Sequence, residues 1–148
     1  MTAVAPDPKK AFLGVGWAFP IGVAAGRTSI AAYDEDIREA IRIIIGTNPG
    51  ERVMRPDFGA GLSEFLFEPV NTTTIETLRR RVQESLIDWE PRIDVLNVTV
   101  TSQFPPDATG VDANGGNVLF IQVAYRVRAT NSNQNLVYPF YLGEGSAR

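Results

Sequence analysis

The chain has 148 residues, of which 44% are apolar and 21% charged, and its formal net charge is −3; these values are ordinary for one soluble globular domain. Cysteine and histidine are both absent, which excludes disulfides, thiol or Ser-His catalysis, and zinc sites built on thiolate or imidazole. The acidic total argues against nucleic-acid binding, and no apolar run is long enough for membrane insertion.

Residues 1–33 predict an arm and a leader that precede the main domain. Residues 1–10 predict a flexible arm, and they carry prolines and charges where a signal peptide needs an apolar stretch, so we expect a protein that is cytoplasmic when made. Residues 12–20 alternate aromatic residues and glycines without helical spacing, which predicts an extended leader that packs its aromatic side chains onto another surface. Those side chains are Phe12, Trp17 and Phe19. The Gly- and Ala-rich residues 21–32 predict a loop.

A first amphipathic helix is predicted after the leader, with Asp34 as its N-cap and Gly46 as its stop. Its apolar residues fall on one stripe. They are Ile37, Ala40, Ile41, Ile44 and Ile45. Residues 51–55 then predict a short strand, and residues 56–61 predict a tight loop.

A second long helix is predicted to start near Asn71, where Thr73 and Glu76 have the spacing of a capping box. Pro91 ends it, because the residue before a proline avoids the helical region. Its apolar stripe has a mean period near that of an α-helix. The stripe consists of Ile75, Leu78, Val82, Leu86 and Trp89.

The apolar period then changes to two, which predicts three strands. In residues 93–103 the side chains of Leu96, Val98 and Val100 are predicted to share one face. Residues 104–116 predict a long exposed turn before a second strand, which buries one face. Those inward residues are Leu119, Ile121, Val123, Tyr125 and Val127, while Val118, Phe120 and Ala124 face outward, where another chain is expected to cover them.

The third strand is predicted over residues 136–142, after a turn at 131–135. Pro139 cannot donate a ladder hydrogen bond, so this strand is expected at the edge of the sheet. Two helices followed by three strands predict an α+β fold in which both helices pack on a small antiparallel sheet, with an extended N-terminal segment. We therefore divide the chain into a leader over 1–33 and a single domain over 34–148.

The candidate catalytic and ligand-binding motifs all have simpler interpretations. The glycines in residues 14–16 lack the third glycine and the helix of a dinucleotide fingerprint. The acids in residues 34–36 are explained as first-turn residues of a helix, and the arginines in residues 79–81 as a solvated or salt-linked face. No pattern predicts a cofactor or a metal ion.

Paired carboxylates suffice for a glycosidase, and four acids are available. They are Asp57, Glu64, Glu68 and Glu90. Nothing in their spacing predicts two of them across a cleft, so we expect no enzyme. The segment Glu90-Pro91-Arg92 is distinctive because it joins the last helix to the first long strand; physical reasoning alone favours a helix stop with a local ion pair.

Three motifs in this order resemble the sheath-initiator family of contractile tails, which includes the small baseplate wedge subunit of contractile phages and its type VI secretion counterpart. Residues 36–45 resemble its first helix, residues 50–59 with Gly61-Leu62 its central loop, and residues 89–93 contain its Glu-Pro-Arg motif. The leader over 12–20 also resembles that of extracellular contractile injection systems.

The resemblance implies a structural protein present in six copies around the spike and tube of the baseplate. It implies docking on the wedge proteins through Glu90, Pro91 and Arg92. It also implies a small sheet that shares strands with the first ring of sheath protein, for which the residues are Leu136, Val137, Tyr138, Pro139, Phe140 and Tyr141. A loop with Arg55, Asp57 and Phe58 is a candidate partner contact. The alternatives are a peptidoglycan-cleaving baseplate lysozyme and an adaptor outside any contractile system.

Overall fold

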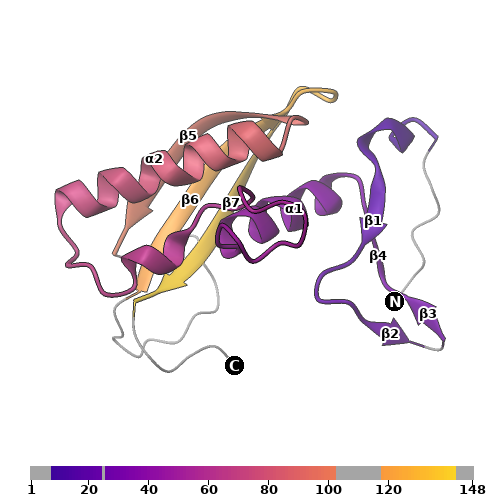
Figure 1. Ribbon diagram of the computed structural model, residues 1–148. Helices are drawn as coiled ribbons and strands as arrows, with labels where there is room; N and C mark the ends of the chain where they lie inside the picture. The colour runs from indigo at the N-terminus through magenta and orange to yellow at the C-terminus, as the bar shows by residue number, and fades with distance from the viewer. Residues whose placement is uncertain (1–7, 25, 103–117, 143–148) are drawn as a thin grey trace.

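The computed structural model describes residues 8–24, 26–102 and 118–142. Among these residues, four short strands precede the two α-helices, and the three long strands of one sheet follow them (Figure 1). In chain order they are η1 (Ala11–Leu13), β1 (Val15–Trp17), β2 (Val23–Ala24), β3 (Arg27–Thr28), β4 (Ile30–Ala32), α1 (Asp34–Gly46), η2 (Leu62–Phe65), α2 (Thr72–Trp89), β5 (Ile93–Thr101), β6 (Val118–Val127) and β7 (Ser132–Tyr141). The predicted arm over 1–10 and the predicted turn over 104–116 lie mostly or wholly outside the described residues.

The body of the molecule is an antiparallel sheet in the order β5-β6-β7, with α1 and α2 on the same face of it (Figure 1). The predicted α+β class, with two helices on a three-stranded antiparallel sheet, is confirmed. The stripes of both helices and the inward face of β6 form one apolar core. That core arises because a 3.6-residue period on the helices and a two-residue period on the strands each gather apolar residues on one side.

The predicted stripes are correct, and α2 begins next to Asn71 as predicted, but the predicted caps of both helices are wrong. The N-cap residue of α1 is Tyr33, which has a positive φ of 61° and makes no side-chain cap hydrogen bond. Asp34 is therefore the first residue inside the helix and not its cap. Asn71 caps α2 by accepting a hydrogen bond from the Thr74 backbone N–H at 2.8 Å. The predicted capping box fails because an asparagine side chain already satisfies this end of the helix.

β5 contains a bulge that the alternation did not predict. The register with β6 shifts between Val95 and Asn97, which places Leu96 at the bulge and leaves it 52% exposed. One extra residue reverses the parity of a strand, so Ile93 is buried before the bulge and Val98 after it. The prediction that Leu96 shares a face with Val98 and Val100 is therefore wrong.

β6 buries all five predicted inward residues, and one outward residue is also buried. Phe120 is only 3% exposed, so it is not available as the uncovered surface that we predicted. The turn into β7 lies at residues 128–131, with Asn131 at a φ of 52°, and β7 begins at Ser132. The predicted turn at 131–135 is thus several residues too late.

Two further predictions of local structure are wrong. Residues 51–55 form turns and not a strand. The predicted loop over residues 21–32 contains three short strands: β2 pairs antiparallel with β3, and β4 pairs antiparallel with β1, which precedes this range. We call the pair β1 and β4 the leader ribbon. It lies against the N-terminal end of α1, beside the body (Figure 1).

Candidate interaction sites

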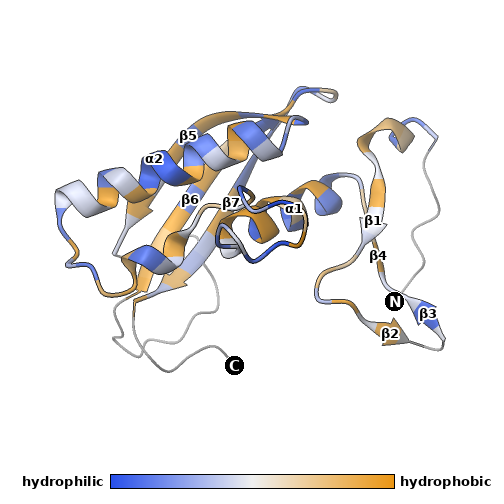
Figure 2. Ribbon diagram, in the orientation of Figure 1, coloured by the Kyte–Doolittle hydropathy of each residue, from blue (hydrophilic) through white to orange (hydrophobic). Residues whose placement is uncertain are grey.

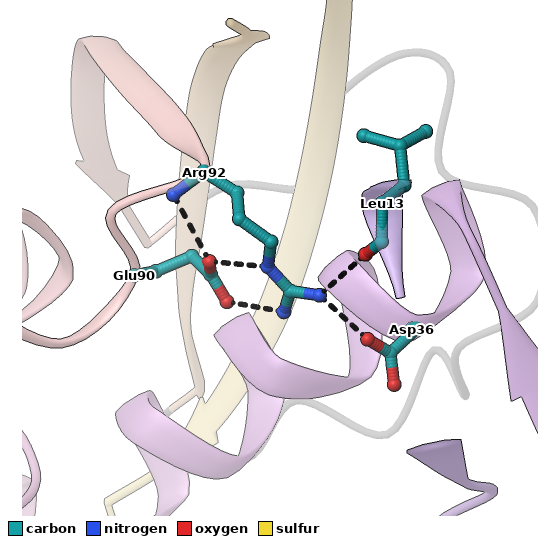
Figure 3. A network of polar contacts seen from close by, with 4 residues as sticks. All are labelled: Leu13, Asp36, Glu90 and Arg92. Atoms are coloured by element: carbon teal, nitrogen blue, oxygen red, sulfur yellow. Dashed lines mark hydrogen bonds and ion pairs between the residues drawn. The ribbon is translucent and has the colours of Figure 1, made fainter. Parts of the chain in front are cut away.

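The corner between α2 and β5 is held by an ion pair between Glu90 and Arg92 (Figure 3). Arg92 donates from Nε and Nη2 to the two carboxylate oxygens of Glu90, each at 2.7 Å. The Arg92 backbone N–H also donates to Glu90 Oε1 at 3.2 Å. Pro91 lies exposed between them and fixes the bend. This bidentate geometry suits a guanidinium and could not be reproduced by lysine.

The same guanidinium reaches two other parts of the chain (Figure 3). Its Nη1 donates to Asp36 Oδ2 at 2.6 Å, on the first turn of α1, and to the carbonyl of Leu13 at 3.0 Å, in the leader. The hydrogen bonds that Arg92 donates to the Glu90 carboxylate raise the pKa of Arg92 above its ordinary value; partial burial lowers it, and the hydrogen bond donated to Asp36 raises it further. Arg92 therefore joins the leader, α1 and the α2–β5 corner.

The leader glycines are explained by this network. Gly14 has a positive φ of 90°, which other residues rarely adopt, and a Cβ at Gly16 would lie 2.5 Å from Asp36 Oδ1. The backbone of β1 thus approaches the Asp36 carboxylate closely. The sequence shows the two glycines and the acidic first turn of the helix, but about twenty residues separate them, so their contact could not be predicted from a local pattern.

The charged side chains of the predicted docking motif, Glu90 and Arg92, bind mainly to each other and to other parts of the same chain. Glu90 is 3% exposed, and both of its carboxylate oxygens are bound by Arg92, so it presents no free carboxylate to a partner. The Arg92 side chain remains 30% exposed. A partner at this corner could therefore reach Pro91 and part of Arg92, whereas Glu90 would act by positioning Arg92.

The loop between α1 and η2 packs back onto the end of α2. The Phe58 ring is buried and meets the Trp89 ring edge-on at 5.2 Å, while the guanidinium of Arg55 lies 5.5 Å from the centre of the Trp89 ring. Gly59 is needed here, since its φ is 108° and a Cβ would lie 2.2 Å from the Thr47 carbonyl oxygen. Of the predicted partner loop, only Arg55 and Asp57 lie at the surface.

A groove of about 590 Å³ opens between this loop and α1. Its lining residues are Ala40, Ile43, Ile44, Thr47, Glu51, Arg52, Phe58, Trp89 and Glu90. The groove is apolar on the α1 side and charged on the loop side. It borders the Glu90–Arg92 corner, so a partner docked at that corner would also meet the groove.

β7 is an edge strand, as Pro139 predicted. It pairs with β6 along its whole length, from Ser132 opposite Val127 to Tyr141 opposite Val118. Within the described residues, no strand pairs with its other edge. Its side chains divide between two faces. Leu136, Tyr138 and Phe140 pack on the core, so Val137, Pro139 and Tyr141 point to the opposite face.

The three arginines in residues 79–81 each form an ion pair with a glutamate of the same chain. Arg79 pairs with Glu76, Arg80 with Glu84, and Arg81 with Glu64. Across the described ranges, acidic side chains nowhere gather into a cluster that could hold a metal ion. In the same part of the chain, neither long helix has the length and apolar content needed to cross a membrane.

The leader aromatics are exposed in the single chain. Phe12, Trp17 and Phe19 were predicted to pack onto another surface, and each keeps more than half of its side chain open to solvent. Leu13, which no periodic pattern singled out, is instead the buried residue of this segment.

Comparison with known proteins gives consistent matches. The family model described as baseplate wedge protein gp25 matches residues 31–132. Over 64 residues the chain is 39% identical to baseplate wedge protein gp25 of Enterobacteria phage T4; the match spans 43% of this chain and 48% of that protein, about half the length of this relative.

Two solved structures share the fold. A Geobacter sulfurreducens protein, provisionally named a tail lysozyme, is 49% identical with a TM-score of 0.65, over 78% of this chain and 96% of that chain. A chain of the anti-feeding prophage baseplate has a TM-score of 0.62 at 23% identity, over 95% of this chain and 94% of that chain.

Proposed function

The chain belongs to the gp25 baseplate wedge family, and from this premise we propose that it docks on the wedge and hub of a contractile baseplate and starts sheath assembly by sharing strands with the first sheath ring. The resemblance found in the sequence motifs is confirmed by this membership, which also makes the chain a baseplate component of a contractile tail system. Sheath initiation, the individual partners and six copies per baseplate belong to the proposal.

The open edge of β7 is the observation that carries this proposal. Ten residues of β7 pair with β6 on one side, and the other side offers a row of backbone groups to an incoming strand. β-Augmentation of this kind takes its affinity from main-chain hydrogen bonds and its specificity from alternate side chains. Val137 and Tyr141 on the face away from the core would contribute that specificity.

The wedge contact is proposed at the α2–β5 corner, where Pro91 and the outer part of Arg92 are accessible. The buried Glu90 carboxylate holds the guanidinium in place, so the motif would work as a preformed, rigid corner. Arg55 and Asp57 on the adjoining loop are proposed to extend this contact. During assembly the subunit would be cytoplasmic and would then become part of the particle.

The proposed role is structural and not enzymatic. A glycosidase needs one carboxyl group that can donate a proton and a second one facing it. Both oxygens of Glu90 accept hydrogen bonds from Arg92, which is not the setting of a proton donor. Zymography on peptidoglycan should show no clearing; clearing that disappears in Glu90→Gln would instead favour the lysozyme.

The strand-sharing step can be tested by charging one sheet edge at a time. Lysines discourage edge pairing, so Val137→Lys with Tyr141→Lys should leave particles without sheath while circular dichroism of the isolated subunit stays unchanged. Leu96→Lys on the opposite edge strand β5 is the matched control, since Leu96 is exposed. Electron micrographs with full-length sheaths on the β7 variant would contradict the proposal. Deleting β7 would be less informative, because it also removes Leu136 from the core.

A further inference from the structure

The leader ribbon has one face on the body and one face in solvent. In its register Gly16 lies opposite Ala31, and Trp17 lies opposite Ile30. Ala31 is buried and Gly16 faces Asp36, so this set of residues faces α1. Neighbouring residues alternate between faces, which turns Val15, Trp17 and Ile30 outward. We call these three residues the leader face; Trp17 is 71% exposed.

Other residues of the leader also expose large apolar side chains. Four other large apolar side chains between residues 12 and 23 are exposed, namely Phe12, Phe19, Ile21 and Val23. Figure 2 shows the apolar colour on β1 and β2, outside the sheet that forms the core. Together with the leader face they make up seven of the fifteen exposed large apolar side chains among the described residues. Such a concentration of exposed apolar side chains in one segment of a folded protein favours an interaction site.

The leader is fixed to the body by polar contacts spread along its length. Arg92 of the body donates to the Leu13 carbonyl at 3.0 Å, while the Tyr33 N–H donates to the Gly14 carbonyl at 3.1 Å within the leader, next to the start of α1. The Phe19 N–H donates to Glu39 Oε2 of α1 at 3.1 Å. These bonds orient the ribbon so that its apolar face points away from the core. A two-stranded ribbon is marginally stable by itself, which makes such anchoring necessary.

The charge of the leader differs in sign from that of the rest of the chain. Residues 1–33 contain Lys9, Lys10 and Arg27 and a single carboxylate, Asp7, a net charge of +2. Residues 34–148 hold the other eleven cations and sixteen carboxylates, a net charge of −5. Lys10 lies 3.8 Å from Asp34 at the junction, whereas Arg27 lies exposed in the far hairpin. Like charges at an interface are unfavourable, so a basic apolar surface suits an acidic apolar partner.

We propose that the leader face is a third docking surface, whose occupant is an apolar, acid-rimmed surface of another protein in the assembled baseplate. The inference rests on the proposed role as a baseplate subunit and concerns a surface separate from β7 and from the Glu90–Arg92 corner. Trp17 is the central anchor, since tryptophan with its large apolar area dominates many interfaces. Arg27 supplies charge at the rim.

Hydroxyl-radical footprinting with mass spectrometry tests the burial directly. Oxidation of Trp17 and Ile30 is compared in the purified subunit and in intact particles, at a dose matched with an added reporter peptide. Strong protection of both residues in the particle is expected. Equal oxidation of Trp17 in the two samples would overturn the proposal.

Substitutions then test whether the apolar and basic residues of the leader are needed for incorporation into baseplates. Trp17→Ser with Ile30→Ser should lower the amount of subunit incorporated into baseplates about tenfold or more. Arg27→Glu should lower it less, and Ile87→Ser, an exposed apolar residue on α2, should leave it unchanged. Thermal melts of the isolated variants should match the parent, which separates docking from folding. Normal incorporation of the double variant would overturn the proposal.

Two other occupants are distinguished by the purified subunit. Sedimentation showing self-association that Trp17→Ser abolishes would assign the leader face to a second copy of this chain and overturn the proposal. Retention on anionic lipid vesicles, lost in the same variant, would assign it to a membrane and also overturn it. The proposed function fails separately, if particles made without this chain still grow sheaths.

Discussion

The body and the leader ribbon use the same kinds of residue in opposite ways. In the body, the apolar face of each helix and of β6 lies in one shared core. In the ribbon, strands of three residues bury only the side that faces α1, and the large apolar side chains point to solvent. The two regions differ in what covers their apolar faces, because the body contains its own opposing layer and the ribbon does not. The apolar residues of the body thus stabilise its fold, and those of the ribbon are left available to the proposed partner.

The largest expected effect is the loss of a core side chain from the body. Ile41→Ala or Leu78→Ala should each destabilise the protein by about 2–5 kcal/mol, because both residues are fully buried in the middle of their stripes. Chemical denaturation of each variant measures the change. Unaltered midpoints for both would mean that the body does not depend on this core, and the contrast with the ribbon would disappear.

Arg92→Ala should have the next largest effect, because Arg92 links the two regions. The substitution leaves the buried Glu90 carboxylate without its partner and releases Leu13 and Asp36, at a cost of about 2 kcal/mol for a partly exposed pair. Arg92→Lys keeps the charge and should recover only part of the loss, since an ammonium cannot bind both carboxylate oxygens in this way.

The result for Arg92 also separates two roles of the corner. Denaturation curves report its contribution to stability, and sheath formation on particles reports docking. A stable Arg92→Ala subunit on particles without sheaths would assign Arg92 mainly to the partner. A destabilised subunit that still forms normal particles would assign it to the fold alone.

These contacts explain which parts of the structure could be predicted from the sequence. The stripes of both helices and the alternation of β6 are local patterns, and they were predicted correctly. The bulge at Leu96 was not predicted, because Leu96 continues the alternation of Val98 and Val100 and these residues fit an unbroken strand. The bond from Arg92 to the Leu13 carbonyl joins residues 79 positions apart, and no local pattern carries it.

Gly16→Ala should have a smaller and local effect. Its Cβ would lie 2.5 Å from Asp36 Oδ1, so either the ribbon or the Asp36 carboxylate must move. We expect a loss of about 1 kcal/mol, with faster amide hydrogen exchange at Gly14 and Trp17 while β6 is unaffected. Gly26→Ala is a control within the leader, since nothing lies within 4 Å of its Cβ, although its φ of 73° adds some strain. Equal exchange in β1 of both variants would show that close packing on Asp36 does not hold the ribbon.

The smallest expected effect concerns the pairing of β5 with β6 at low pH. Arg126 and Arg128 lie 2.9 and 2.7 Å from the two carboxylate oxygens of Asp94, and their hydrogen bonds lower its pKa. A carboxyl whose pKa is lower in the folded state adds stability above its unfolded pKa of about 3.9, and this stability is lost as pH falls through the folded value. Because the Asp94 side chain is 32% exposed and its two arginine partners are more exposed, solvent screens these pairs and the change should be small.

The free energy of unfolding of the isolated subunit should respond differently to truncation in the leader ribbon and in the body. Trp17→Ser should change the free energy of unfolding by no more than about 0.5 kcal/mol, because an exposed side chain loses little on truncation. Val98→Ser, on β5 of the body, removes a smaller side chain but should be clearly destabilising, because Val98 is buried and a hydroxyl would replace it in the core. Thermal melts at one protein concentration compare the two. If Trp17→Ser proved as destabilising as Val98→Ser, the leader face would be packed within the chain, and its apolar residues would serve the fold instead of a partner.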